Sequence, residues 1–121
     1  MLVIDDEVHL GTCIKRMLKQ HDVSLVTDGD EGFERLRAGA LPDLVLCDLL
    51  MPGRTGMELY QALFQCRPEA LGRMVFMTGA SDLPEWEQFL KQHSAVRVLP
   101  KPFDSGSLEA LVAGVLRGDQ L

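Results

Sequence analysis

The sequence predicts an α/β fold in which a parallel β-sheet is covered by helices on both faces. Short apolar segments typical of strands alternate along the chain with longer segments whose apolar residues recur at helical spacing. The strand-like segments are nearly continuous in apolar residues, as expected where both faces of a sheet are buried. The length of 121 residues suits a single domain, which we expect to span residues 1–121.

Five strands are expected, and each is a short run of mostly apolar residues. They are Leu2–Ile4, Val23–Val26, Leu44–Cys47, Met74–Met77 and Val96–Leu99. Right-handed crossovers between parallel strands limit the topologies that such an order of elements can adopt.

Five helices are expected, one after each strand, and several residues mark where they begin or end. Gly39 suits the end of the second helix, Pro68 stops the third, Pro84 lies near the start of the fourth, and Asp104 or Ser105 caps the last. The apolar sides are expected to contain, in chain order, Leu10, Cys13, Ile14, Met17 and Leu18; Phe33 and Leu36; Met57, Tyr60, Leu63 and Phe64; Trp86, Phe89 and Leu90; and Leu108, Leu111, Val112, Val115 and Leu116.

Composition excludes several classes of protein. Hydrophobic residues make up 46% and charged residues 25%, which is ordinary for a soluble globular fold. The net charge of −6 argues against direct nucleic-acid binding. No apolar run is long enough to insert in a membrane and no signal peptide is visible, so a cytoplasmic location is expected. Cys13, Cys47 and Cys66 lack CxxC spacing and are expected to be reduced.

Familiar catalytic motifs are missing. His9, His21 and His93 are scattered and are expected on the surface or in loops. No GxGxxG, P-loop, GxSxG or HExxH pattern occurs, which argues against the usual nucleotide, esterase and zinc-protease sites.

Five polar residues follow directly on predicted strands. Asp5 and Asp6 come after the first strand, Asp48 after the third, Thr78 after the fourth and Lys101 just beyond the fifth. The carboxyl ends of parallel strands share one edge, where ligands bind in open α/β sheets, so these side chains are expected in one pocket. Three carboxylates there would repel one another, and a hard cation such as Mg²⁺ relieves this. The pattern predicts a site for a divalent cation and a phosphoryl group.

The chemistry expected at this site is attack by Asp48 on phosphorus to give an acyl phosphate, with the metal and the Lys101 ammonium neutralising charge. Each residue also has a plainer interpretation. Asp5 and Asp6 suit a helix start, Asp48 suits a solvated loop, Thr78 suits an ordinary turn, and a lone lysine is usually a surface charge. The functional interpretation depends on all five together.

Four segments resemble motifs of the receiver domain of two-component response regulators, a bacterial signalling family. Ile4–Glu7 is similar to its first acidic motif, and Cys47–Gly53, followed by Gly56, is similar to its phosphoacceptor loop. Met77–Ala80 and Pro100–Phe103 are similar to its hydroxyl and lysine motifs. The resemblance extends over nearly the whole chain.

This resemblance implies a flavodoxin-like (βα)5 fold with strand order 2-1-3-4-5. It implies that Asp48 accepts a phosphoryl group from a phosphohistidine on a sensor histidine kinase or a histidine phosphotransfer protein. Asp5, Asp6, Asp48 and the backbone carbonyl of Leu50 would hold Mg²⁺, or Mn²⁺ as an alternative. Thr78 and Lys101 would contact the phosphoryl oxygens.

The resemblance also implies a read-out and a context. A second copy of the chain, or an effector, would bind the face made by the fourth helix, fifth strand and fifth helix. The chain is expected to be either the receiver segment of a hybrid sensor kinase or a single-domain regulator.

Two features depart from the family pattern. Val98 stands where the family usually carries a switch Tyr or Phe, so the output is expected to use helix movement, or the domain acts mainly as a phosphate relay or sink. Leu50 and Ala80 border the expected pocket and are both apolar. We expect them to give a hydrolytic water little help, so that the phosphoryl group persists.

The leading interpretation is a phosphoacceptor signalling domain that catalyses only its own phosphorylation and is not a turnover enzyme. One alternative is an aspartyl-phosphate phosphatase or phosphotransferase, although such enzymes typically carry a DxD motif near the first strand. A second is a pseudo-receiver that acts as a phosphorylation-independent interaction module. A third is a flavin-binding domain of similar fold, which predicts a yellow protein.

Overall fold

A computed structural model describes residues 1–79 and 83–118 of the chain. Within these residues lies a parallel five-stranded sheet of order β2-β1-β3-β4-β5, as predicted. Its strands are β1 (Leu2–Ile4), β2 (Ser24–Val26), β3 (Val45–Asp48), β4 (Met74–Thr78) and β5 (Arg97–Pro100). The chain adds β2 on one side of β1 and then β3, β4 and β5 on the other side. The strand order therefore changes direction at β1, and β1 and β3 are neighbours.

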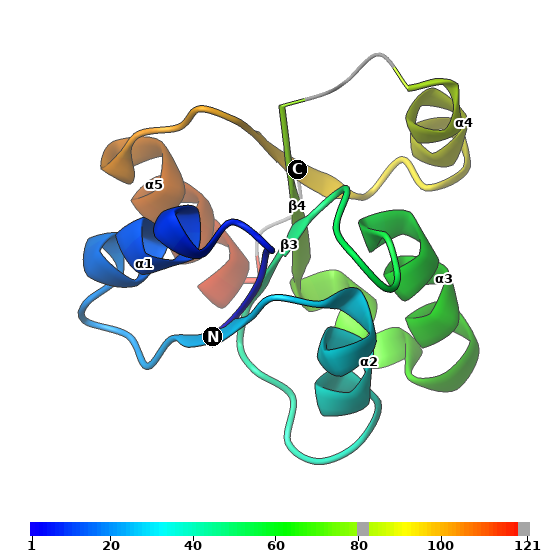
Figure 1. Cartoon of the computed structure of the whole chain (residues 1–121), viewed down its shortest axis with the longest axis horizontal. Helices are drawn as coiled ribbons and strands as arrows, with labels where there is room; N and C mark the ends of the chain where they lie inside the picture. Colours follow the sequence, from blue (N-terminus) through cyan, green and yellow to red (C-terminus); the bar gives the residue numbers. More distant parts are fainter. Residues whose placement is uncertain (80–82, 119–121) are drawn as a thin grey trace.

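Helices connect the strands and cover both faces of the sheet (Figure 1). One face is covered by α1 and α5, and the other by α2, α3 and α4. The bounds are α1 (Val8–Met17), α2 (Gly29–Arg37), α3 (Gly56–Cys66), the 3₁₀ helix η1 (Pro68–Arg73), α4 (Pro84–Gln92) and α5 (Ser105–Leu116). The predicted α/β class is confirmed, and η1 is an addition that the helical spacing did not predict.

Successive strand residues point to opposite faces, so the sheet separates two hydrophobic cores. Val3, Leu46 and Val75 face the helices α1 and α5, where Ile14 and Val112 are buried against them. The other core contains strand and helix residues from the α2, α3 and α4 side, namely Ile4, Val45, Cys47, Phe76, Leu36, Leu59, Leu63, Trp86 and Phe89. Burial on both faces explains why the strand segments lack polar alternation.

Side chains cap several helices at the edge of the sheet where the strands end. Asp28 caps α2 by accepting hydrogen bonds from two backbone amides of its first turn. Thr55 and Glu58 form a reciprocal capping box that begins α3. Asp104 caps α5, which decides between the two residues that were predicted for this position. These caps set where each helix starts relative to the preceding strand.

Some predicted positions are wrong in detail. β3 and β5 both begin and end one residue later than predicted, so Asp48 is the last residue of β3. Phe64 is 54% exposed, although the spacing predicted it on the apolar side of α3. Leu59 and Leu63 occupy that buried side, and Phe64 follows about 100° further round the helix. Leu116, at the end of α5, is likewise exposed.

His9 and His21 are exposed, as predicted, and His93 lies in a loop, which also agrees with the prediction. It follows α4 and is half-buried, with its ring centroid 4.6 Å from that of Phe89 and 4.9 Å from that of Tyr60. The three cysteines are free, as predicted, but Cys47 is buried whereas Cys13 and Cys66 are exposed.

Among the described residues, no helix combines the length and the apolar character needed to cross a bilayer.

Candidate functional site

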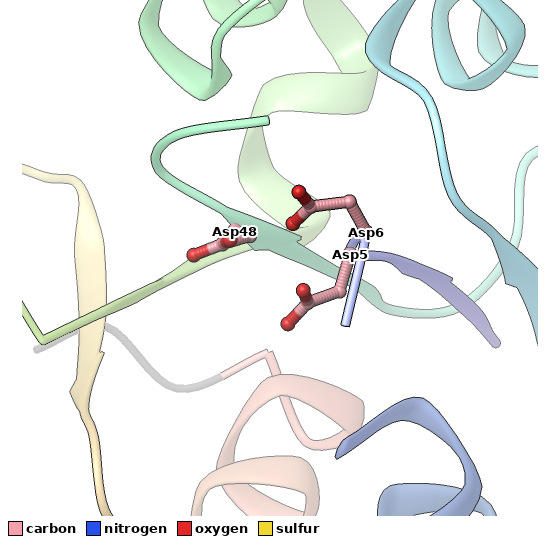
Figure 2. Close-up of side chains that lie close together, drawn as sticks. All are labelled: Asp5, Asp6 and Asp48. Atoms are coloured by element: carbon pink, nitrogen blue, oxygen red, sulfur yellow. The ribbon is translucent and has the colours of Figure 1, made fainter. Parts of the chain in front are cut away.

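Three carboxylates gather where β1 and β3 end side by side. Asp5 and Asp6 follow directly on β1, and Asp48 ends β3, whose Cys47 is paired with Ile4 of β1. Figure 2 shows the carboxyl groups of Asp5 and Asp6 directed toward the side on which Asp48 lies. One oxygen from each residue can be chosen so that all three lie within 4.8 Å of one another. The predicted convergence of these aspartates is thus present in the structure.

Lys101 reaches the same place from the end of β5. Its ammonium Nζ lies 3.1 Å from Asp48 Oδ1 and 3.3 Å from Asp5 Oδ2, and donates a hydrogen bond to each. Glu7 Oε1 lies 3.7 Å away and extends the acidic surroundings of this ammonium group. The backbone holds the lysine in place, because Lys101 N donates to the carbonyl oxygen of Thr78 at 2.9 Å.

Thr78 and Leu50 lie where the strands β4 and β3 end. Thr78 is the buried last residue of β4, the strand between those that lead to Asp48 and Lys101. Leu50 lies two residues after Asp48 and is 47% exposed. Ala80, expected beside the pocket, lies outside the described residues.

Burial makes the pocket electrostatically strained before any ligand binds. Asp5 is 3% exposed and Asp48 is 8% exposed. Burial, and then the negative charge of Asp5, raise the pKa of Asp48 to about 6, although Lys101 and the Leu49 amide favour its ionised form. Burial likewise raises the pKa of Asp5, against the opposing effects of the Glu7 amide and Lys101. The pocket holds more negative charge than its one lysine balances.

The pKa of Lys101 also rises, and for an ammonium group a raised pKa favours the charged form. Burial alone would lower the pKa of Lys101, but its hydrogen bond to Asp48 and the charges of Asp48 and Asp5 outweigh burial and raise that pKa. The ammonium group is therefore kept charged beside the carboxylates. It is a fixed positive group next to a carboxylate that can act as a nucleophile.

The donor set fits a small, hard divalent cation. All three residues offer carboxylate oxygens, and Mg²⁺ takes oxygen ligands at about 2.0–2.1 Å, which places opposite ligands about 4.2 Å apart. The chosen oxygens all lie within 4.8 Å of one another, so they face the space that a single ion would occupy. A cation between Asp5, Asp6 and Asp48 would also offset the repulsion that raises the pKa of Asp48.

Two features beside the site, the crowding at Gly56 and a contact with α2, come from the structure. A side chain at Gly56 would place its Cβ 2.8 Å from Asp48 O and 2.9 Å from the Phe76 ring, so this position admits no larger residue without movement. The loop from Leu49 to Thr55 is bound to the start of α2, chiefly through Arg54 and Asp30. The glycine follows the phosphoacceptor-like motif and was visible in the sequence. The contact with α2 is long-range and had no sequence signal.

Comparison with known proteins agrees with the fold and indicates one family of domains. A family model described as the response regulator receiver domain matches residues 1–113. The DNA-binding transcriptional regulator NtrC of Escherichia coli is 34% identical over 112 residues, which cover 91% of this chain and 23% of NtrC. The transcriptional regulatory protein DltR of Streptococcus agalactiae is 30% identical over 129 residues, covering 100% of this chain and 56% of DltR. The chain thus spans about half or less of these relatives.

A solved structure supports the same fold. The receiver domain of a sensor histidine kinase from Pseudomonas aeruginosa, described with a magnesium ion coordinated in its active-site cleft, superposes with a TM-score of 0.82. The match covers 96% of this chain and 95% of that one at 20% sequence identity. At this identity the likeness concerns the arrangement of strands and helices.

Proposed function

This chain belongs to the response regulator receiver domain family, and we propose that it is a phosphoacceptor domain in which Asp48 is phosphorylated. The observation that carries the proposal is that Lys101 Nζ lies 3.1 Å from the Asp48 carboxylate, at the edge where Asp5 and Asp6 also end. A nucleophile, a cation and two further metal-ligand candidates therefore occupy one pocket. Receiver domains are signalling domains, so no turnover of a separate substrate is proposed.

Asp48 supplies the attacking oxygen. Its carboxylate forms a bond to phosphorus while the bond from phosphorus to the donor's imidazole nitrogen breaks, and the electron pair returns to that nitrogen. The pKa of about 6 leaves most Asp48 side chains ionised near neutral pH, which attack requires. Lys101 and the Thr78 hydroxyl contact the phosphoryl oxygens, and Lys101 exchanges one of its carboxylate contacts for them.

Asp5, Asp6, Asp48 and the backbone carbonyl of Leu50 are the proposed ligands of Mg²⁺, with Mn²⁺ as an alternative. When bound, the metal offsets the negative charge shared by the carboxylates and the incoming phosphoryl group. The magnesium described in the Pseudomonas receiver domain supports this assignment by analogy of fold.

The proposed partner is a histidine kinase or a histidine phosphotransfer protein, which the domain would meet in the cytoplasm. We propose that residues 1–121 form one receiver domain that is either a segment of a hybrid sensor kinase or a single-domain regulator. The neighbour in a sensor histidine kinase favours the first possibility, and relatives such as DltR favour attachment to an effector. The face made by α4, β5 and α5 is the proposed surface for a second copy or an effector.

Incubation with acetyl phosphate and Mg²⁺, followed by intact mass measurement, tests the proposal. We expect one added phosphoryl group, absent from Asp48→Ala and formed about 100-fold more slowly by Lys101→Ala. Asp43→Ala, which changes an exposed acid before β3 at the opposite edge of the sheet, serves as the control and should behave as wild type. An adduct that persists in Asp48→Ala would reject the assignment of Asp48.

The same experiment separates the alternatives. No adduct in the folded wild-type protein would indicate a phosphorylation-independent interaction module. Repeated release of phosphate from a generic phosphoester would indicate an aspartyl-phosphate phosphatase.

A further inference from the structure

The loop that joins Asp48 to α3 is attached both to the strands that end at the pocket and to α2, which supplies none of the pocket residues. Its first residue, Leu49, donates its amide to Met77 O at 3.1 Å and accepts from Gly56 N at 2.8 Å. Its middle is bound to α2, because Gly29 N donates to Pro52 O at 3.0 Å. Leu50, whose carbonyl is a proposed metal ligand, lies between these two attachments.

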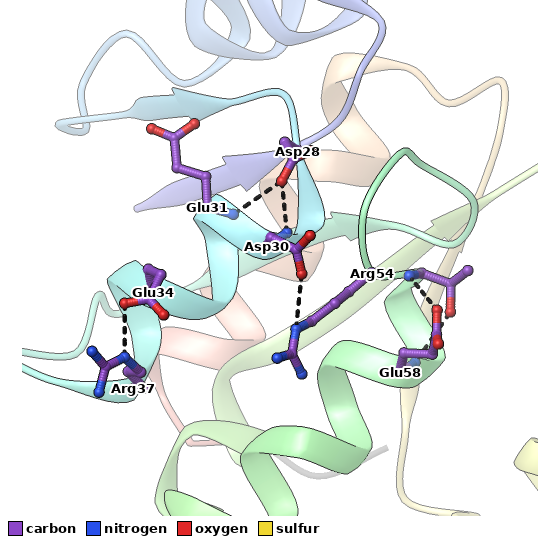
Figure 3. A network of polar contacts seen from close by, with 8 residues as sticks. Asp28, Asp30, Glu31, Glu34, Arg37, Arg54 and Glu58 are labelled. Carbon is purple, nitrogen blue, oxygen red and sulfur yellow. Dashed lines mark hydrogen bonds and ion pairs between the residues drawn. The ribbon is translucent and has the colours of Figure 1, made fainter.

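Arg54 strengthens the attachment to α2 by two contacts from one side chain. Its Nε donates to Asp30 Oδ1 at 3.0 Å (Figure 3). Its guanidinium carbon also lies 4.1 Å above the centroid of the Phe33 ring. Arginine suits this position because its planar group can pair with a carboxylate and stack on an aromatic face at once. Asp30 and Phe33 both belong to α2, so Arg54 ties the loop to one rigid helix.

The loop also passes very close to the acidic start of α2. Gly53 has φ +74°, and a Cβ at this residue would lie 2.8 Å from Asp30 Oδ2 and 3.0 Å from Asp28 Oδ1. A side chain there would collide with the carboxylate that Arg54 binds and with the one that caps α2. The loop is therefore seated against α2 by backbone, ion-pair and ring contacts together.

We propose that Arg54, with Asp30 and Phe33, is a positioning residue that holds the Leu49–Thr55 loop so that the Leu50 carbonyl meets the metal. This inference rests on the proposed function, and it assigns to α2 a part in metal binding although α2 contributes none of the proposed ligands. Groups that orient metal ligands without touching the metal typically change affinity by about tenfold or more when removed.

The sign of the effect distinguishes positioning from simple electrostatics. Removing the positive charge of Arg54 near an acidic site would, by charge alone, tighten the binding of a divalent cation. Loss of loop positioning would weaken it. Arg54→Gln is therefore expected to bind Mg²⁺ about tenfold more weakly than wild type, opposite to the charge effect.

The α2 helix offers a matched control. Arg37 Nε pairs with Glu34 Oε2 at 2.8 Å, and both partners belong to α2. The Arg37 side chain is 52% exposed and that of Arg54 is 37% exposed, while the two acids are similarly exposed at 62% and 64%. Figure 3 shows the pair of Arg37 with Glu34 on α2, and Arg54 reaching Asp30 of the same helix from the loop. Arg37→Gln removes the same charge from the same region and is expected to leave Mg²⁺ affinity within about twofold of wild type.

The test measures Mg²⁺ affinity by calorimetry, and amide hydrogen exchange in the metal-free protein. We expect peptides covering residues 49–56 to exchange faster in Arg54→Gln than in wild type or Arg37→Gln, while the thermal midpoints of both variants remain equal. Asp30→Asn is a second variant, and the double variant should bind Mg²⁺ no more weakly than Arg54→Gln alone.

Equal Mg²⁺ affinity and loop exchange in Arg54→Gln and Arg37→Gln would overturn the positioning role, provided that wild type binds the metal. Absence of Mg²⁺ binding in wild type would instead reject the proposed function, and unaltered loop exchange in Arg54→Gln would then reject the positioning role as well.

Discussion

At the scale of single residues, Lys101 controls the charge balance of the pocket. It is the cation that contacts both Asp5 and Asp48, which are buried at 3% and 8% exposure. Lys101→Met should therefore raise the pKa of Asp48 further above about 6, because the group that favours its ionised form is gone. Titration of the metal-free variant, followed by carbon NMR of the aspartate carboxyls, measures this. An unchanged Asp48 titration would contradict the assigned contact.

The raised pKa of Asp48 also predicts how stability depends on pH. The ordinary aspartate value is 3.8 and the value in the folded protein is about 6, so the folded state binds the proton more tightly than the unfolded chain. The free energy of unfolding of the metal-free protein should therefore fall as pH rises from about 4 to about 6, by roughly 1–3 kcal/mol from this group. Urea unfolding at several pH values measures it.

Asp48→Asn provides the control for this dependence, because the amide cannot titrate. The variant should be more stable than wild type at pH 7 and should lose the part of the slope that Asp48 contributes. Other acids, including Asp5, titrate in the same range, so the difference between the two proteins is the informative quantity. Identical slopes would show that Asp48 is not strained in the free protein.

We propose that the side chain of Leu50 affects how long a phosphoryl group remains on Asp48. Its apolar side chain, 47% exposed beside Asp48, can neither orient nor deprotonate an attacking water. Leu50→Asn should accelerate loss of the phosphoryl group by roughly tenfold, because an amide can hold such a water. Leu116→Asn, at a residue of similar exposure at the end of α5, is the matched control. The decay of the adduct mass with time gives the rate, and equal decay in all three proteins would refute the idea.

At the scale of elements, α4 contacts the sheet largely through rings. Phe76 of β4, two residues before Thr78, lies 5.6 Å from Trp86 and 5.8 Å from Phe89 between ring centroids. Val98 in β5 lacks a ring, so we propose that a movement at Thr78 would reach α4 through this aromatic contact. Because residue 98 is not aromatic, α4 is the element in which we expect a movement.

The single tryptophan makes this testable without a label. Trp86 is buried against Phe76 and Phe89, so a shift of α4 changes its surroundings. We expect the emission of Trp86 to change when acetyl phosphate and Mg²⁺ are added to wild type but not to Asp48→Ala. Constant emission during complete phosphorylation of wild type would mean that α4 keeps its position, as in a relay or sink.

At the scale of the whole molecule, the two cores should contribute independently to stability because the sheet separates them. Ile14→Ala in one core and Leu63→Ala in the other each remove a fully buried side chain and should cost about 2–5 kcal/mol. The double variant should lose the sum of the two within about 0.5 kcal/mol. Urea denaturation of the four proteins tests this, and strong coupling would show that strain crosses the sheet.

Much of this organisation followed from local pattern. The five strands and the convergence of Asp5, Asp48 and Lys101 were predictable, because strand ends in a parallel sheet share an edge. The exposure of Phe64 and the contact of the His93 ring with Tyr60 were not. Helical spacing gives only the approximate side of a helix on which a residue lies, and ring contacts depend on other elements. The contact of the Leu49–Thr55 loop with α2 joins segments that lie far apart in the sequence, and no spacing of residues predicted it.

The crowding at Gly56 restricts which sequences can build this pocket. The Cβ of even an alanine would stand 2.8 Å from the backbone oxygen of Asp48 and 2.9 Å from the Phe76 ring. A saturation library at codon 56, selected for signalling, should return glycine even when Phe76 is randomised as well, because the clash with the Asp48 backbone oxygen does not depend on the ring. Survivors with a larger residue at 56 would show that the backbone at Asp48 can shift without loss of signalling.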